Sequence, residues 1–212
     1  MIASPFLESK NAMLDVINLE FEYPDKPLLT GIYFRLQEGC LLHLRGGNGA
    51  GKTTLLKLLS GLLRPLTGEI LYRGHAIHHD LMSYQQRICT VGHKTGLNPF
   101  LTVREHCRLE AQRSPLVLRF DDLMDAFLLR GFEDVTCGLL SVGLRRRVSL
   151  LRLLMSDAPL WLMDEPLVGL DKEAVRLLMH HVNQHLVRGG AIVLTSHQSL
   201  PMRSDHYQEY LL

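Results

Sequence analysis

The sequence is poor in cysteine and tryptophan, and it lacks both a long apolar run and an excess of charge of either sign. Its 212 residues include 4 cysteines and 1 tryptophan, and 23 Lys and Arg side chains balance 22 Asp and Glu side chains. With a net charge of only +1, the chain has no general field for polyanions, so no nucleic-acid partner is expected. No stretch approaches the roughly 18 continuous apolar residues that cross a bilayer. A role at a membrane would therefore depend on a partner that spans it.

No C-x-x-C spacing connects the four cysteines, which are Cys40, Cys89, Cys107 and Cys137. This scatter favours small buried side chains in a reducing compartment over disulfides or a zinc site. The N-terminal stretch MIASPFLESKNA has no basic region and is interrupted by a proline and a glutamate, so a secretory signal is not expected. These features predict a cytosolic protein.

Two apolar patterns predict two kinds of strand. Apolar and polar residues alternate over 14–36 and again over 68–74, as in half-exposed antiparallel strands. Three nearly continuous apolar runs end at Gly46, Asp164 and Ser196, and this pattern is typical of strands buried on both faces of a parallel sheet. Ligand sites in such sheets lie beyond the carboxyl ends of the strands.

Helical patterns fill the segments between these runs. One helix is expected at 52–60 and would end at Gly61, a residue suited to the C′ position. A second is expected over 172–188, with Asp171 as its N-cap and Gly189 after its end.

The segment 102–154 is mostly helical in pattern, with breaks at 114–120 and 130–138. Hydrophobic residues make up 46% of the chain, enough for one sizeable core. We therefore expect one domain in which a helical lobe interrupts the order of the sheet.

The stretch GGNGAGKT matches the phosphate-loop pattern G-x-x-x-x-G-K-[ST] and lies between a buried strand and a helix. Its glycines let the backbone wrap closely, so that N–H groups and the helix N-terminus face phosphate oxygens. The lysine is expected to reach the β- and γ-phosphates, and the threonine after it to ligate Mg²⁺. The predicted ATP-binding residues here are Gly46, Gly47, Asn48, Gly49, Ala50, Gly51, Lys52, Thr53 and Thr54.

Polar residues follow the two other buried runs. Asp164 is placed to hold Mg²⁺ together with Thr53, and Glu165 is placed to polarise an attacking water. His197 follows the third run, at the same predicted sheet edge, within reach of a γ-phosphate. We therefore expect Glu165 and His197 to be catalytic.

The phosphate loop, LSVG, LWLMDEP, GLD and TSH, in this order, resemble the ABC-type ATPase family over nearly the whole chain. The resemblance implies an α/β fold of the P-loop NTPase class. The cassette implied by this resemblance has a parallel core sheet, an antiparallel β subdomain and an inserted helical subdomain. Residues 1–212 would form a single ABC ATPase domain, with the helical subdomain at about 94–154. The resemblance also implies ATP and Mg²⁺ as cofactors and a head-to-tail pair formed with a second copy of the chain.

The resemblance assigns further roles. Tyr23 would stack on adenine, Asp171 would communicate across the pair, and His197 would sense the γ-phosphate. Ser141 and Gly143, in the signature LSVG, would contact the ATP held by the partner chain.

Two positions depart from the common family pattern. His93 stands where the family has a glutamine, and an imidazole is bulkier than an amide and titrates near neutrality, so its contact with Mg²⁺ is left open. In the signature, Val142 and Leu144 replace a glycine and a polar residue. We expect these changes to weaken closure of the pair, and we expect Val142→Gly with Leu144→Gln to strengthen it.

VGHKTG, GFED, LWLMDEP and GGAIVLTSHQSL together resemble the ATP-binding subunits of bacterial cytochrome c maturation haem exporters. This resemblance implies membrane permease partners, a peripheral location on the cytoplasmic face of the inner membrane, and hydrolysis tied to haem export or to release of a haem chaperone. Three alternatives are a cassette for another exported substrate, a soluble ABC ATPase acting on ribosomes or DNA, and a nucleotide-binding subunit that barely hydrolyses ATP.

The histidines do not predict a haem site in this chain. His75, His78 and His79 are expected in a solvated loop, and His181 and His185 on a polar helix face. We therefore expect the partners to hold haem.

Three consecutive arginines follow the signature. Successive helical residues are about 100° apart, so these three cannot all face one ligand. Arg145 is expected near the nucleotide, whereas Arg146 and Arg147 are expected to be salt-bridged or solvated.

Overall fold

The computed structural model describes most of the chain. The described residues are 12–24, 26–112, 119–198, 200, 202 and 206–212. The N-terminal stretch discussed above and most of the expected break at 114–120 lie outside them.

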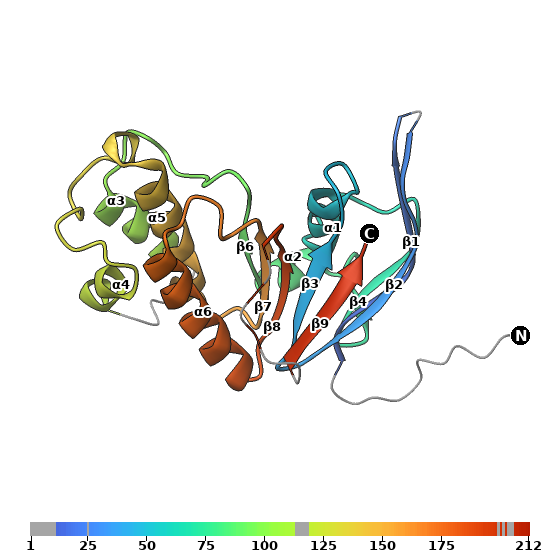
Figure 1. Cartoon of the computed structure of the whole chain (residues 1–212). Coiled ribbons are helices and arrows are strands. Elements are labelled where there is room, and N and C mark those ends of the chain that lie inside the picture. Colours follow the sequence, from blue (N-terminus) through green and yellow to red (C-terminus); the bar gives the residue numbers. More distant parts are fainter. Residues whose placement is uncertain (1–11, 25, 113–118, 199, 201, 203–205) are drawn as a thin grey trace, which may run out of the picture.

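A five-stranded parallel sheet forms the centre of the molecule, in the order β6-β7-β8-β3-β9 (Figure 1). The three predicted buried strands are confirmed as its inner members, whereas the two edge strands were not predicted. One edge strand has only four residues and the other is half-exposed, so neither carries the long apolar pattern of a buried strand. The strands are β3 (Leu41–Arg45), β6 (Ile88–Val91), β7 (Leu160–Asp164), β8 (Ala191–Thr195) and β9 (Tyr207–Leu211).

Successive side chains of each inner strand enter two different cores, which explains their continuous apolar sequence. Leu41, Met163 and Leu194 pack on the side of α5 and α6. Leu42 and Val193 pack on the opposite side, with α1 and the antiparallel sheet. Figure 1 shows these two layers on either side of the parallel sheet.

The antiparallel sheet has the order β2-β1-β4-β5 and confirms both alternating segments as strands. Buried residues alternate with exposed ones over much of β2, as expected of a sheet with one solvated face. The long pair β1–β2 extends beyond the parallel sheet (Figure 1). The strands are β1 (Ala12–Tyr23), β2 (Lys26–Gln37), β4 (Thr67–Tyr72) and β5 (His75–Ala76).

Both predicted isolated helices are confirmed. α1 (Lys52–Leu59) is followed by Gly61 at φ 72°, and α6 (Lys172–Val187) is followed by Gly189 at φ 85°. The Asp171 side chain accepts the N–H of Ala174 at 2.8 Å, so it caps α6 as predicted. A short helix, α2 (Leu81–Gln85), was not predicted.

Helical segments lie between β6 and β7 in the chain, and Figure 1 shows α3, α4 and α5 together beyond one side of the parallel sheet. They contribute Val103, Leu123 and Val148 to the core on that side. The segments are α3 (Val103–Ala111), α4 (Phe120–Ala126), the 3₁₀ turn η1 (Cys137–Leu139) and α5 (Val142–Met155).

All four cysteines are buried and free, as the sequence predicts. Burial raises the pKa of Cys89 and of Cys107 to about 12, so these thiols are protonated near neutral pH. Within the described part of the chain, no helix has both the length and the apolar character needed to cross a membrane.

Candidate active site

The phosphate loop connects β3 to α1 at the carboxyl edge of the parallel sheet. Gly46, Gly49 and Gly51 have φ values of 150°, 83° and 99°, which side-chain-bearing residues rarely adopt. A Cβ atom on Gly51 would lie 2.7 Å from Leu29 Cδ2. The β1–β2 hairpin therefore packs against the start of α1 and requires glycine there.

Lys52 lies inside this loop rather than in solvent. Its Nζ donates hydrogen bonds to the carbonyls of Gly46 at 2.7 Å and Gly47 at 3.0 Å, and the residue is 8% exposed. These contacts hold the ammonium within the loop, where phosphate oxygens would meet it.

Thr53 and Asp164 are brought together from distant parts of the chain. Thr53 Oγ1 donates to Asp164 Oδ2 at 2.8 Å, and Thr195 Oγ1 donates to Asp164 Oδ1 at 2.7 Å. The hydroxyl and carboxylate oxygens form the hard donor set that Mg²⁺ prefers. Thr195 was not predicted as a site residue, because in the sequence it is one more residue of an apolar strand.

Glu165 lies next to His197 and has an unusual backbone conformation. Its φ is 49°, and its N–H donates to the carbonyl of Thr195 at 3.1 Å and to Thr195 Oγ1 at 2.9 Å. One carboxylate oxygen, Oε2, accepts the N–H of His197 at 3.3 Å. The other, Oε1, is buried, lies 3.5 Å from His197 Nε2, and has no hydrogen-bond partner among the described residues. This oxygen can accept a proton from a water molecule.

Tyr23 ends β1 close to the first turn of α1. Its hydroxyl lies 3.4 Å from Thr54 Oγ1, and the ring of Phe21 stands edge-on at 5.1 Å. Tyr23 is 41% exposed, so part of its side chain is open to a planar ligand beside the phosphate loop.

The signature residues lie at the N-terminus of α5, which is across the parallel sheet from α1 (Figure 1). Ser141 Oγ accepts the N–H of Leu144 at 3.2 Å, so Ser141 is the N-cap of α5. A Cβ on Gly143 would lie 2.9 Å from the carbonyl oxygen of Gly169, so this position tolerates little more than glycine. Val142 is 66% exposed, whereas Leu144 is partly buried and packs against the core.

The sequence model of the ABC transporter family matches residues 29–168. The chain belongs to this family. Its geometry agrees with that membership, since the phosphate loop, the Asp164 carboxylate and the exposed end of α5 are the parts expected of an ABC cassette.

Curated relatives match over nearly the full chain. The cytochrome c biogenesis ATP-binding export protein CcmA of Legionella pneumophila strain Lens is 52% identical, covering 94% of this chain and 100% of that protein. The protein of the same name from Dechloromonas aromatica is 40% identical with the same coverage, and that of Escherichia coli K12 is 39% identical over 89% of this chain and 90% of its own.

Solved structures show the same fold. An ATP-binding subunit of an ABC transporter superposes with a TM-score of 0.80 at 29% identity, covering 87% of this chain and 79% of its own. CbiO1 of Clostridium perfringens, part of an ABC transporter complex, superposes with a TM-score of 0.72 at 25% identity, covering 89% and 79%. The predicted α/β cassette fold is confirmed, and the chain is an ABC-type ATPase.

Asp171 has a second contact in this cassette besides capping α6. Arg147 Nη2 lies 2.5 Å from Asp171 Oδ2, so the signature helix is ion-paired to the turn that follows Glu165. The hydrogen bond from Ala174 and the charge of Arg147 lower the pKa of Asp171. The predicted salt bridge of Arg147 is confirmed.

The expectation for Arg146 is wrong. This side chain is only 4% exposed, and it donates to backbone carbonyls rather than to a carboxylate. Burial lowers its pKa, and the charges of Asp164 and Glu165 oppose this effect. In a run of three arginines, nothing in the sequence distinguishes a buried side chain from an exposed one. The burial of Arg146 was therefore not predicted.

His93 is exposed in the loop after β6. The carbonyl of the preceding residue, Gly92, accepts a hydrogen bond from Arg146 Nη1 at 2.8 Å. Because Val91 pairs with Met163 in the sheet, this loop begins beside the strand that ends at Asp164.

Some of the histidines that were considered as haem ligands have surroundings other than those expected from the sequence. His75 belongs to β5 rather than to a loop, and both ring nitrogens of His78 are buried without a hydrogen-bond partner among the described residues. His181 packs on Phe127 at 5.5 Å, and His185 stacks on the ring of Trp161 at 3.8 Å.

Burial lowers the pKa of His181, and it lowers that of His185 to about 4, so these two residues do not form a solvated face. No group of three or more potential metal ligands occurs within the described ranges.

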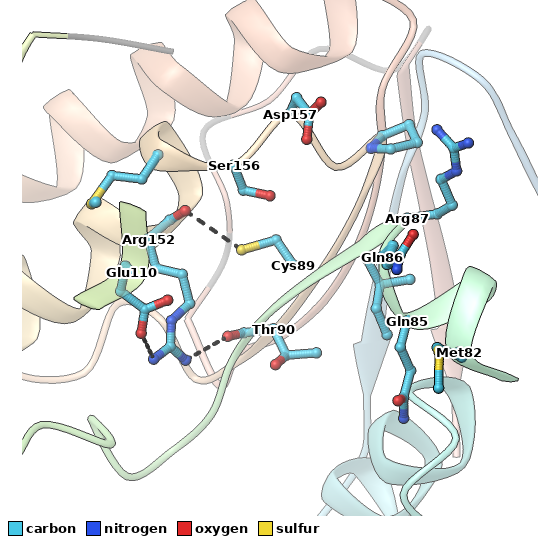
Figure 2. Close-up of a pocket in the computed structure, with 13 residues that line it drawn as sticks. Met82, Gln85, Gln86, Arg87, Cys89, Thr90, Glu110, Arg152, Ser156 and Asp157 are labelled. Carbon is cyan, nitrogen blue, oxygen red and sulfur yellow. Dashed lines mark hydrogen bonds and ion pairs between the residues drawn. The ribbon is translucent and has the colours of Figure 1, made fainter. Parts of the chain in front are cut away.

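A groove of about 630 Å³ lies beside β6 and the C-terminal end of α5 (Figure 2). Arg152 extends into it, pairing with Glu110 at 2.7 Å and donating to the carbonyl of Thr90 at 3.3 Å. The residues that line this groove include none of the predicted ATP-binding or catalytic residues, so it is separate from the candidate active site.

Proposed function

We propose that this chain is the ATP-hydrolysing subunit of a membrane ABC transporter that exports haem for cytochrome c biogenesis. The observation that carries the ATPase part is the cluster of Thr53, Asp164, Glu165 and His197 beside a phosphate loop. The names of the curated relatives support the assignment to cytochrome c biogenesis.

ATP would bind with its phosphates in the loop 46–54 and its adenine on Tyr23. The Lys52 ammonium would exchange its two carbonyl partners for β- and γ-phosphate oxygens, an exchange that keeps its charge hydrogen-bonded.

Thr53 and Asp164 fit a magnesium ion, because their oxygens already lie 2.8 Å apart and both are hard donors. When bound, this ion would neutralise charge on the phosphates. His93 is exposed, and we leave it outside the set of direct ligands.

Hydrolysis would rely on Glu165 as the group that orients and polarises water. Its Oε1 is the buried acceptor without a hydrogen-bond partner, while Oε2 is fixed by the backbone of His197. The His197 ring, more than half exposed, would face the γ-phosphate from the segment that follows β8.

A second copy of the chain would complete the site. Ser141 and Gly143 stand at an exposed helix N-terminus, which attracts anions, and Figure 1 places α5 across the sheet from α1. We infer that they contact the partner's ATP and that Asp171 links the two sites.

The partners would include membrane permease subunits, which would hold haem and keep this chain on the cytoplasmic face of the bacterial inner membrane. Residues 1–212 would act as one ABC ATPase domain, with 94–154 as its helical subdomain.

The test is ATP hydrolysis by the native membrane complex. Glu165→Gln should lower kcat by roughly 100-fold or more while keeping nucleotide binding, and Lys52→Ala should weaken binding itself. Lys57→Ala, an exposed lysine of the same helix, and Glu173→Gln, in the first turn of α6, are the matched controls and should change neither. Hydrolysis insensitive to Glu165→Gln would reject the proposed ATPase role.

The haem assignment has its own test. The membrane proteins that co-purify with this chain should carry haem, detected by its absorbance, and ATP should change the amount retained. Co-purification with haem-free permeases would favour a different exported substrate, and a chain found without any membrane protein would favour a soluble ABC ATPase.

A further inference from the structure

Arg146 is a buried cation that donates hydrogen bonds to the backbone around the proposed catalytic residue Glu165. Its guanidinium donates from Nη2 to the carbonyls of Asp164 at 3.0 Å and Glu165 at 2.6 Å. It also donates from Nε to the carbonyl of Pro166 at 3.2 Å and from Nη1 to that of Gly92 at 2.8 Å. One side chain therefore joins the end of β7 to the loop after β6.

These bonds act on a strained residue. Glu165 has a φ of 49°, in the left-handed region that residues with a side chain rarely adopt. Such a conformation persists only where the surroundings fix it on both sides. Here Thr195 holds the N–H of Glu165, and Arg146 holds its carbonyl.

Arg146 bonds to backbone carbonyls and not to carboxylates, so it does not interfere with the binding of metal or water. An arginine paired directly with the Asp164 or Glu165 carboxylate would occupy the oxygens needed for metal and water. Bonded to carbonyls behind them, Arg146 orients the same residues and leaves their side chains free. Its planar group has five N–H donors in fixed directions, whereas a lysine has at most three on a single nitrogen.

We propose that Arg146 is a positioning residue for ATP hydrolysis, which holds Glu165 in its strained conformation and fixes the loop that carries His93 to the same turn. The inference rests on the proposed ATPase function. Since α5 also carries Ser141 and Gly143, the helix that would meet the partner's ATP is the one that orients this chain's own Glu165.

Arg152 offers a matched control on the same helix. It also donates to a carbonyl next to β6, that of Thr90 at 3.3 Å, but its other contact is the ion pair with Glu110 (Figure 2). Arg152→Gln therefore removes a partly buried tether of α5 without removing any contact to the Glu165 turn.

The experiment compares steady-state hydrolysis by Arg146→Gln, Arg146→Lys and Arg152→Gln in the full native complex. Misplacing a catalytic group by about 1 Å costs on the order of 100-fold, so Arg146→Gln should lower kcat by roughly 30- to 100-fold with KM for ATP within about threefold. Arg146→Lys should fall between Arg146→Gln and the natural chain, and Arg152→Gln should keep kcat within about twofold. A kcat for Arg146→Gln equal to that of Arg152→Gln would overturn the proposal.

A double variant separates positioning from general damage. If Arg146 acts through Glu165, Arg146→Gln should slow the residual hydrolysis of Glu165→Gln by no more than about twofold, because the positioned group is already gone. If the two losses multiply, Arg146 acts independently of Glu165 and the proposal is wrong.

Hydrogen exchange gives a readout that does not depend on activity. Arg146→Gln, or Arg146→Lys if the first variant does not fold, should raise amide exchange at Glu165 and Val168, whose N–H groups are hydrogen-bonded, by roughly tenfold while α5 stays protected. Unchanged exchange there would overturn the proposal. Failure of Glu165→Gln to lower natural hydrolysis would instead reject the proposed ATPase function, with the exchange result still deciding the role of Arg146.

Discussion

The phosphate loop and the N-terminus of α5 are both expected to contact ATP, yet they differ in how much of their surroundings the chain itself supplies. Lys52 and Thr53 contact the loop carbonyls and Asp164 of the same chain. At α5, Ser141 contacts only its own helix through its cap bond, and neighbouring Val142 is open to solvent. The phosphate-loop part of the ATP site is assembled when the single chain folds. The part at the N-terminus of α5 would be completed only when two chains associate.

We therefore expect substitutions in the two regions to affect different properties of the protein. Substitutions of Gly46 or Gly51 in the phosphate loop should disturb a single folded chain, because a Cβ atom at either position would lie 3.0 Å or less from another part of the chain. Substitutions at the exposed end of α5 should leave the fold nearly unchanged and act on pairing. The following variants test this division, from the largest expected effect to the smallest.

Gly51→Ala should nearly abolish hydrolysis. The new Cβ would lie 2.7 Å from Leu29 Cδ2 at a residue with φ 99°, so alanine would strain the backbone of the loop just before α1 and force Leu29 to shift. We expect kcat/KM to fall by roughly 100-fold or more. Gly189→Ala is the control, because it has a similar φ of 85° but open space around it. It should cost only about 1 kcal/mol of unfolding free energy, and hydrolysis by both variants at the natural rate would contradict the prediction.

Ser141→Ala should lower ATP-driven pairing and hydrolysis by roughly tenfold, since it removes the helix cap and, under the proposed function, a hydroxyl that would contact the partner's nucleotide. Thr102→Ala is matched to it, because Thr102 caps α3 through a bond to the Glu105 N–H at 3.2 Å. Each variant should lose about 1 kcal/mol of stability.

Sedimentation with ATP in the Glu165→Gln background measures pairing, and steady-state turnover measures hydrolysis. Only Ser141→Ala should change them. If Thr102→Ala has the same effect, the loss at Ser141 reflects helix stability and not contact with a second chain.

Leu144→Gln should destabilise the chain instead of strengthening closure. The side chain packs against the core, so burying an amide there should lower the free energy of unfolding by roughly 1–2 kcal/mol. Val187→Gln, at a residue that is 82% exposed, should change it by less than about 0.5 kcal/mol. Denaturant unfolding of both variants checks this, and equal stabilities would show that Leu144 is not part of the core.

Val142→Gly should have the smallest effect, an increase. Removing an exposed branched side chain lets the backbone approach the partner more closely, and we expect ATP-driven pairing to rise about threefold, or roughly 0.6 kcal/mol. Val142→Ala should give a smaller rise, because it retains Cβ. No change in both variants would show that this departure from the family pattern is neutral, and a fall would show that Val142 favours pairing. The structure thus separates two signature changes that the sequence could only treat together.

Local patterns predicted a large part of the fold. The three inner strands, the β1–β2 hairpin and both isolated helices follow from apolar spacing and from Gly61, Asp171 and Gly189 at helix ends. The edge strands β6 and β9 were missed because pairing with a neighbour, rather than their own sequence, makes them strands. The stack of His185 on Trp161 was missed for a similar reason, as it joins α6 to the start of β7.

By itself, the sequence determined the chemistry that depends on short spacing. A glycine-rich loop before a lysine and two threonines, and two carboxylates after an apolar strand, are fixed by neighbours in the chain. The tertiary structure alone decided which of three consecutive arginines points inward, which of the two altered signature residues packs against the core, and what holds Glu165 in its strained conformation. These outcomes depend on contacts between segments far apart in the chain, and such contacts form only when the sheets and helices pack.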